Sequence, residues 1–172
     1  MYNVVGTEKI NFGRFELIMD TVEKNGEKHP FSFVKIRSGV CVIPFVGDNQ
    51  VILLREYRHP IKSWQYQFAC GMIDEGESPE EAAKRELEEE IGCAAEEIYE
   101  LGYTYPSYGS TTEKIYLFAA KCTEIRRTDC EPLEYIEYHK TDVKTIEKMF
   151  AENEIVSSAS QVAWFRWKLS QT

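Results

Sequence analysis

Three glutamates between residues 86 and 90 have the carboxylate side chains and the spacing that a cation site needs. Glu86, Glu89 and Glu90 stand at positions i, i+3 and i+4, a spacing that brings side chains on a helix to about 5–6 Å from one another. Like charges this close destabilise a helix by roughly a few tenths of a kcal/mol and raise carboxylate pKa values. A divalent cation removes that conflict, and oxygen ligands on a rigid helix suit Mg²⁺. The alternative is a solvated helix that is rich in glutamate because glutamate forms helices well.

The residues around these glutamates predict a packed helix rather than a disordered acidic run. The stretch 78–81 supplies an N-cap serine, a proline at the first helical position and the glutamate of a capping box. Gly92 ends the helix. Ala83, Leu87 and Ile91 recur at i, i+4 and i+8, which gives an apolar stripe that can pack on a sheet.

The net charge of −9 is concentrated around this helix. Residues 74–97 contain 11 acidic and two basic side chains, and the rest of the chain is balanced at 18 of each. A duplex nucleic-acid surface would need clustered lysine and arginine instead. We therefore expect no nucleic-acid partner.

Length and composition indicate one domain outside the membrane. The 172 residues, of which 43% are hydrophobic, can bury one sizeable core. The longest apolar run, residues 40–46, is far shorter than the ~20 residues of a membrane span, and residues 1–10 lack the pattern of an export signal. Five cysteines without a CxxC pair suggest neither a disulfide framework nor a zinc site. We expect a cytoplasmic protein.

Hydrophobic patterning predicts a mixed sheet with helices packed against it. The expected turns cover residues 24–26 and 47–49. The expected helices near the C-terminus run from about Asp142 to Glu152, and from Ser158 or Ser160 onward with Val162, Phe165 and Leu169. The expected strands cover residues 15–22, 31–37, 40–46, 51–55, 98–103, 114–121 and 133–138.

The segment 71–93, GMIDEGESPEEAAKRELEEEIGC, resembles the signature of the Nudix hydrolases at every fixed position, with Cys93 where the pattern has an aliphatic residue. The resemblance implies an α+β fold: a Nudix-type α/β/α sandwich with a mixed central sheet and an additional N-terminal antiparallel sheet. It implies one domain over residues 1–172, with 1–37 as a dimerisation element and 38–172 as the catalytic core.

The same resemblance assigns roles to residues of this segment. Gly71 and Gly76 would let the backbone turn tightly, so that the main-chain carbonyl of Cys70 faces a metal. Glu77 would pair with Arg85 and so fix the loop to the helix. The implied metal ligands are the Cys70 carbonyl and the carboxylates of Glu86, Glu89 and Glu90. The implied ion is Mg²⁺, with Mn²⁺ as the alternative, and it would neutralise a diphosphate and activate water.

Beyond the signature, the chain resembles the ADP-ribose pyrophosphatase branch along residues 40–45, 51–58, 64–71 and the N-terminal stretch. This resemblance implies that Glu113, at the end of loop 105–113, is the general base. It places Arg58 and Arg37 near the terminal ribose, the phosphates or the partner subunit, and Phe15 near an adenine. The alternatives are a solvated loop acid, surface arginines and a core phenylalanine.

Two departures from the branch affect the substrate prediction. Tyr108 stands where the branch usually has proline, and Gln67 stands where it commonly has glutamate. We expect hydrolysis of ADP-ribose or a related nucleoside diphosphate sugar to a nucleoside monophosphate and a sugar phosphate, by a homodimer. The alternatives are a Nudix hydrolase of another nucleotide, such as a dinucleoside polyphosphate, and a non-catalytic nucleotide-sugar sensor.

Overall fold

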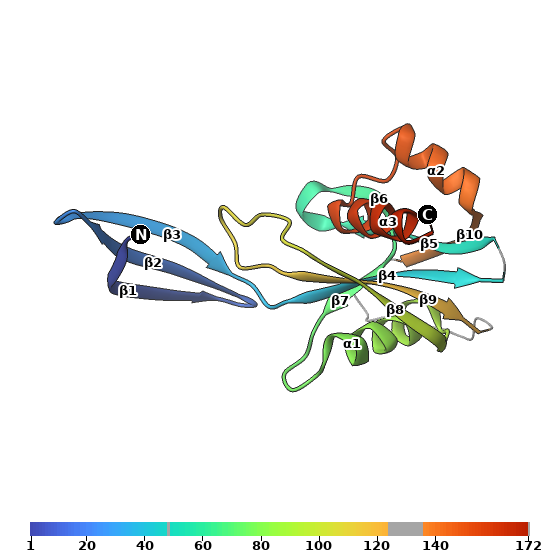
Figure 1. Ribbon diagram of the computed structural model, residues 1–172, viewed down its shortest axis with the longest axis horizontal. Helices are drawn as coiled ribbons and strands as arrows, with labels where there is room; N and C mark the ends of the chain where they lie inside the picture. Colours follow the sequence, from blue (N-terminus) through green and yellow to red (C-terminus); the bar gives the residue numbers. More distant parts are fainter. Residues whose placement is uncertain (48, 124–135, 172) are drawn as a thin grey trace. The chain divides into compact units, whose positions relative to one another are not determined.

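The computed structural model describes residues 1–47, 49–123 and 136–171. The chain forms two compact units (Figure 1). The first consists of residues 1–38 and 105–114, and the second of residues 39–104 and 115–172.

The first unit is a three-stranded antiparallel sheet in the order β1-β2-β3. The predicted turn between β2 and β3 is present, because Asn25 and Gly26 both adopt positive φ angles of 55° and 83°, as tight hairpins require. The N-terminal strand was not predicted from its pattern, and all ten of its residues are exposed. The strands are β1 (Asn3–Phe12), β2 (Phe15–Lys24) and β3 (Glu27–Lys35).

The segment 105–114 extends this sheet along β3. Val34 and Thr111 form a parallel bridge. The Val34 N–H donates to the carbonyl of Ser110 at 2.9 Å, and its own carbonyl accepts from the Thr112 N–H at 3.0 Å. The segment is a loop, as expected, and backbone hydrogen bonds hold it to its neighbour.

The second unit contains a seven-stranded mixed sheet in the order β10-β5-β4-β9-β8, with β6 paired to β5 and β7 paired to β4. Strands β4 and β9 are parallel and the other pairs are antiparallel. The strands are β4 (Gly39–Val46), β5 (Gln50–Arg58), β6 (Ser63–Gln67), β7 (Ala69–Met72), β8 (Ala95–Thr104), β9 (Ile115–Cys122) and β10 (Ile136–Asp142). A 3₁₀ turn, His59–Ile61, follows β5. Residues 133–135 of the expected last strand lie outside the described residues.

Helices cover both faces of this sheet: α1 (Pro79–Glu86) packs on one face, and α2 (Val143–Ala151) and α3 (Ser158–Ser170) pack on the other (Figure 1). The burial of strand β4 explains its continuous run of apolar residues. Val40 and Val42 are buried on the α1 face, whereas Cys41 and Ile43 are buried on the α3 face. A strand covered on both sides needs apolar residues at every position. The predicted α/β/α sandwich is confirmed.

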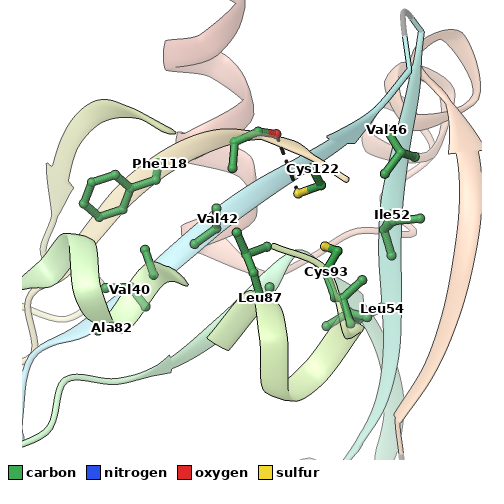
Figure 2. Close-up of a cluster of buried hydrophobic side chains, with 14 residues drawn as sticks. Val40, Val42, Val46, Ile52, Leu54, Ala82, Leu87, Cys93, Phe118 and Cys122 are labelled. Atoms are coloured by element: carbon green, nitrogen blue, oxygen red, sulfur yellow. Dashed lines mark hydrogen bonds between the residues drawn. The ribbon is translucent and has the colours of Figure 1, made fainter. Parts of the chain in front are cut away.

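Cys93 packs in the cluster on the α1 face, with Leu87 and Cys122 among its neighbours (Figure 2). Its side chain is almost completely buried. The residue therefore acts as a small hydrophobe at the position where the Nudix signature has an aliphatic side chain.

The last helix buries a different face from the expected one. Phe165 and Leu169 are exposed, and Val162 is half-buried. The side chains that α3 buries are Ala159, Ser160, Ala163 and Trp164. Small residues on this face let the helix approach the sheet closely, while the indole of Trp164 stacks on Phe68. Among the described residues, the structure contains no helix with the length and apolar character that crossing a bilayer requires.

Candidate active site

The helix that carries the three glutamates begins as predicted and then widens. Ser78 accepts a hydrogen bond from the Glu81 N–H, and the Glu81 side chain accepts one from the Ser78 N–H, which completes the capping box. After Glu86 the helix continues as a π-helical turn, Leu87–Ile91, and ends at Gly92 with φ 72°. Such turns are often found at functional sites. This one changes the angular spacing of the glutamates relative to a regular α-helix.

The expected ion pair between Glu77 and Arg85 is present. Arg85 Nε and Nη2 donate to the two Glu77 oxygens at 2.9 and 3.0 Å, which makes the ion pair bidentate. Glu77 also accepts from the Asp74 N–H at 3.0 Å. The hydrogen bonds from Arg85 lower the pKa of the Glu77 carboxyl, together with that backbone bond. This pair ties the loop that contains Gly76, at φ 86°, to the helix.

Arg85 also connects the loop to two of the predicted metal ligands. Its Nη1 donates to Glu86 at 2.7 Å and to Glu89 at 2.9 Å, while Nη2 donates to the Met72 carbonyl at 2.8 Å. These carboxylates, with Glu77 first, raise the pKa of Arg85. The guanidinium is therefore a permanent cation that orients the acidic group.

Gly71 has a different role from the turn that the resemblance implied. The residue lies in β7 without a positive φ angle. A Cβ at this position would collide with the carboxylate of Glu86. Gly71 therefore provides the space that lets Glu86, itself only 8% exposed, lie against the strand.

Glu90 is the most deeply placed carboxylate of the group, with 5% exposure. Its oxygen accepts a hydrogen bond from the Cys70 N–H at 3.0 Å. Burial, and then the nearby Cys70 and Glu86, raise the pKa of Glu90 well above its usual range. A buried carboxylate that loses hydration and meets a second carboxylate favours either a proton or a cation.

The Cys70 carbonyl is directed to the same side as its N–H. Cys70 lies directly opposite Cys41 in an antiparallel ladder, and in such a ladder the N–H and C=O of one residue point the same way. Since the N–H donates to Glu90, ladder geometry predicts that the carbonyl lies on the side of the carboxylates. A hydrogen bond with Cys41 and burial raise the pKa of the Cys70 thiol, so its backbone, not its sulfur, serves the site.

Glu89 differs from the other two glutamates. Its side chain is 50% exposed and it pairs with Arg85. Across residues 1–47, 49–123 and 136–171, no three histidine, cysteine, aspartate or glutamate side chains converge as a ready set of metal ligands. Two buried carboxylates and one carbonyl nevertheless fit Mg²⁺, which commonly binds one or two carboxylates and completes its shell with water and phosphate oxygens.

A second polar group, which the sequence analysis did not identify as a unit, lies on the same face of the sheet. Arg58 Nη2 donates to Gln67 Oε1 at 2.7 Å and lies 2.8 Å from Glu56 Oε2. Gln67 Nε2 donates to the same Glu56 oxygen at 2.8 Å. A signal was available in the sequence: Glu56 follows Ile52 and Leu54 at a spacing of two, which places a carboxylate on a buried strand face.

The remaining predicted site residues belong to the first unit. Phe15 is exposed, with the Arg14 guanidinium 4.9 Å above its ring. Arg37 is exposed just beyond β3. Tyr108 is 85% exposed, and Glu113 is half-buried next to Thr112. The structure thus brings together the predicted site residues of the second unit: Cys70, Glu77, Arg85, Glu86, Glu89 and Glu90, with Arg58 in the neighbouring group.

Comparisons with known proteins identify the family and the fold. The family model of the NUDIX domain matches residues 35–168. An ADP-ribose pyrophosphatase of Bacillus subtilis (strain 168) is 24% identical over 163 residues, which are 92% of this chain and 88% of that protein. A methanol dehydrogenase activator of Bacillus methanolicus is 34% identical over 119 residues, 68% of this chain and 64% of that protein. A crystal structure of an ADP compounds hydrolase has the same fold, with a TM-score of 0.85 at 24% identity over 97% of this chain and 92% of that one.

Proposed function

The chain belongs to the NUDIX domain family and is a hydrolase of that class, and from this premise we propose that it cleaves the diphosphate linkage of ADP-ribose or a related nucleoside diphosphate sugar. The products would be AMP, or another nucleoside monophosphate, and a sugar phosphate. The similarity to a protein named ADP-ribose pyrophosphatase over most of both chains supports this substrate class.

The observation that carries the proposal is the pair of buried carboxylates beside the Cys70 backbone. Glu86 and Glu90 would hold Mg²⁺, or Mn²⁺ in its place, together with the Cys70 carbonyl. When bound, the ion would supply charge neutralisation for the diphosphate and acidify an attacking water. Arg85 orients the Glu86 carboxylate at 2.7 Å and Glu77 holds Arg85 in turn. Glu89, which the signature makes a third ligand, pairs with the same arginine.

Residues of the first unit complete the proposal. Glu113 is proposed as the general base that takes the proton from the attacking water, a role in which a carboxylate must reach that water to ~3 Å. Phe15 and Tyr108 present exposed rings that can stack on a nucleobase, and Arg37 presents a guanidinium group for the phosphates or the ribose. Arg58 of the second unit would do the same.

A homodimer through residues 1–37 is part of the proposal. The first sheet exposes Val4, Val5, Ile10 and Phe12 along β1, and exposed apolar side chains that cluster on one element often mark an association surface. Sedimentation equilibrium would test the assembly: a monomeric mass at micromolar concentration would contradict it.

The function is tested by assaying the chelator-treated protein with a panel of nucleotides while AMP and sugar phosphate are separated by chromatography. We expect no turnover without metal and turnover of ADP-ribose after Mg²⁺ is added. Preferred cleavage of a dinucleoside polyphosphate would replace the substrate assignment. Binding of ADP-ribose without turnover under all metals would indicate a sensor instead, and turnover that persists in excess chelator would overturn the metal assignment.

A further inference from the structure

We propose that Glu56 is a positioning residue, which acts with Gln67 to hold the Arg58 guanidinium in place for a phosphate group of the substrate. This inference rests on the proposed function and deepens it, because it names the group that fixes a phosphate-binding arginine. Three kinds of observation carry it: the face on which these residues lie, the direction of their hydrogen bonds, and the burial and charge around them.

Sheet register places all three residues on the face of the sheet that α1 covers. Leu54 packs in the cluster on that face, and Glu56 and Arg58 follow it on β5 at a spacing of two, so they point the same way. Gln67 lies directly opposite Leu54 on β6, and opposed residues of a ladder share a face. The face is the one on which Glu86 and Glu90 lie.

The hydrogen bonds show which atoms of Glu56 and Gln67 hold the Arg58 guanidinium. Gln67 uses both ends of its amide: Oε1 accepts from Arg58 at 2.7 Å and Nε2 donates to Glu56 at 2.8 Å. Glu56 lies 2.8 Å from the same Arg58 nitrogen. The guanidinium is therefore held by one carboxylate and one amide oxygen, and the amide nitrogen also restrains that carboxylate. Only a side chain with both a donor and an acceptor can do this at position 67.

Burial differs between the residue that holds the arginine and the arginine itself. The Glu56 side chain is 11% exposed, whereas the Arg58 side chain is 40% exposed. Both contacts engage Nη2, and a large part of the Arg58 side chain remains accessible to solvent. An arginine whose orientation is fixed before binding loses less side-chain entropy when an anion arrives. Fixing Arg58 in this way should therefore strengthen its hold on a phosphate group.

The charges also link this group to the carboxylate pair. Glu56 is among the groups that raise the pKa of Glu90, and the charges of Arg58 and Glu56 both act on Cys70. The arginine and the carboxylate pair also share the face of the sheet that α1 covers, so one ligand bound over that face can meet both groups. A cation at Glu86 and Glu90 and the guanidinium of Arg58 would offer two positive groups to a single diphosphate.

An exchange of side chains tests the proposal. Glu56→Gln removes the charge partner of Arg58, and Gln67→Glu replaces the amide donor to Glu56 with a second carboxylate oxygen, so that two like charges meet at hydrogen-bond distance. We expect each single variant to raise the KM for ADP-ribose about tenfold while kcat stays within about threefold. The double variant E56Q/Q67E puts the carboxylate at position 67 and the amide at position 56, so we expect its KM to return to within about threefold of the wild type.

The controls separate positioning from a merely structural effect. In an Arg58→Ala background, E56Q should cause no further rise in KM, because Glu56 acts through that arginine. Glu137→Gln removes the partner of a half-buried arginine on the same strand, Arg55, at 3.1 Å, and should leave KM unchanged. Single variants with wild-type KM, or a double variant as impaired as the combined singles, would overturn the proposal.

Binding of α,β-methylene-ADP with Mg²⁺, measured by calorimetry, repeats the same cycle without turnover. If the wild-type protein binds this probe but releases no AMP from ADP-ribose, the proposed function is wrong and the binding cycle alone decides the role of Glu56. A dissociation constant that follows the KM pattern across the cycle supports the inference. A wild-type protein that does not bind the probe at all contradicts it.

Discussion

The carboxylate of Glu86 lies in the space that a side chain at Gly71 would occupy. The glycine is in a regular strand without positive φ, so the backbone itself would accept another residue. What requires glycine here is the approach of the acidic side chain from the helix to the strand. The position of the Glu86 carboxylate therefore depends on the absence of a single methyl group at Gly71.

Gly71→Ala tests this relationship. The added methyl group must displace the Glu86 carboxylate, and a shift of about 1 Å in a catalytic group can cost about a hundredfold in rate. We expect kcat/KM to fall by about that factor, while the free energy of unfolding falls by less than about 2 kcal/mol because a flexible carboxylate can move aside. Gly6→Ala is the matched control, since its Cβ would meet only ordinary contacts with Thr21. Equal activities of the two variants would contradict the prediction.

The three glutamates should differ in their contribution to catalysis. Glu90 is buried and Glu89 is half-exposed in an ion pair with Arg85, so the metal affinity should depend more on Glu90. We expect Glu90→Gln to lower kcat at least about a hundredfold, and Glu89→Gln to lower it about tenfold or less. Calorimetric titration with Mg²⁺ and steady-state rates measure both effects. Wild-type hydrolysis of ADP-ribose by the Glu90→Gln protein would show that the metal assignment is wrong.

The pair of Glu77 and Arg85 predicts a pH-dependent contribution to stability. Arg85 lowers the pKa of Glu77 below its ordinary value of 4.5, so the folded state favours the ionised form. The stabilisation is therefore complete above that ordinary value and is lost as the pH falls through the lower folded pKa. We expect Glu77→Gln to lower the free energy of unfolding by about 1–2 kcal/mol at pH 7, and the difference to shrink below pH 4.5.

Urea denaturation of both proteins at a series of pH values measures this difference. Glu80→Gln provides the control, because its exposed pair with Lys84 should contribute well under about 1 kcal/mol at any pH. A constant difference between wild type and Glu77→Gln from pH 3 to pH 7 would rule out the ionic origin of the effect.

Local signals were sufficient to predict much of this fold. The capping box at Ser78, the positive-φ glycine at Gly92 and the continuous apolar run of β4 each depend on neighbours in the chain. The face of α3 could not be predicted this way. A helix buries the side that fits the sheet, and the small residues Ala159 and Ala163 allow closer packing than the larger Phe165 and Leu169.

The sequence predicted which residues form the site better than it predicted how these residues are arranged. Regular helical spacing placed Glu86, Glu89 and Glu90 together, but the π-helical turn depends on tertiary packing, and Glu89 is 50% exposed where Glu86 and Glu90 are buried. The group formed by Glu56 and Gln67 joins two strands whose register the sequence does not state. Such contacts follow from strand pairing, which a reading of each segment alone cannot supply.

Thr112 predicts how the proposed general base depends on the first sheet. Its hydroxyl donates to the Ile36 carbonyl at 3.1 Å and accepts from the Ile36 N–H at 2.9 Å, so one side chain fixes segment 105–114 to the end of β3. Glu113 is the next residue. If that carboxylate must be held near an attacking water, Thr112→Val should lower kcat about tenfold with a smaller change in KM.

Thr7→Val is the matched control, because Thr7 also makes a side-chain hydroxyl bond within this sheet, to Asp20 at 2.6 Å, yet lies far from the segment along the chain. It should change stability by about 1 kcal/mol and leave kcat unaltered. Hydrogen exchange of the Thr112 and Val34 amides measures the loosening directly. Faster exchange in Thr112→Val without any loss of kcat would show that the anchor is structural, and would remove the support that this contact gives to Glu113 as the base.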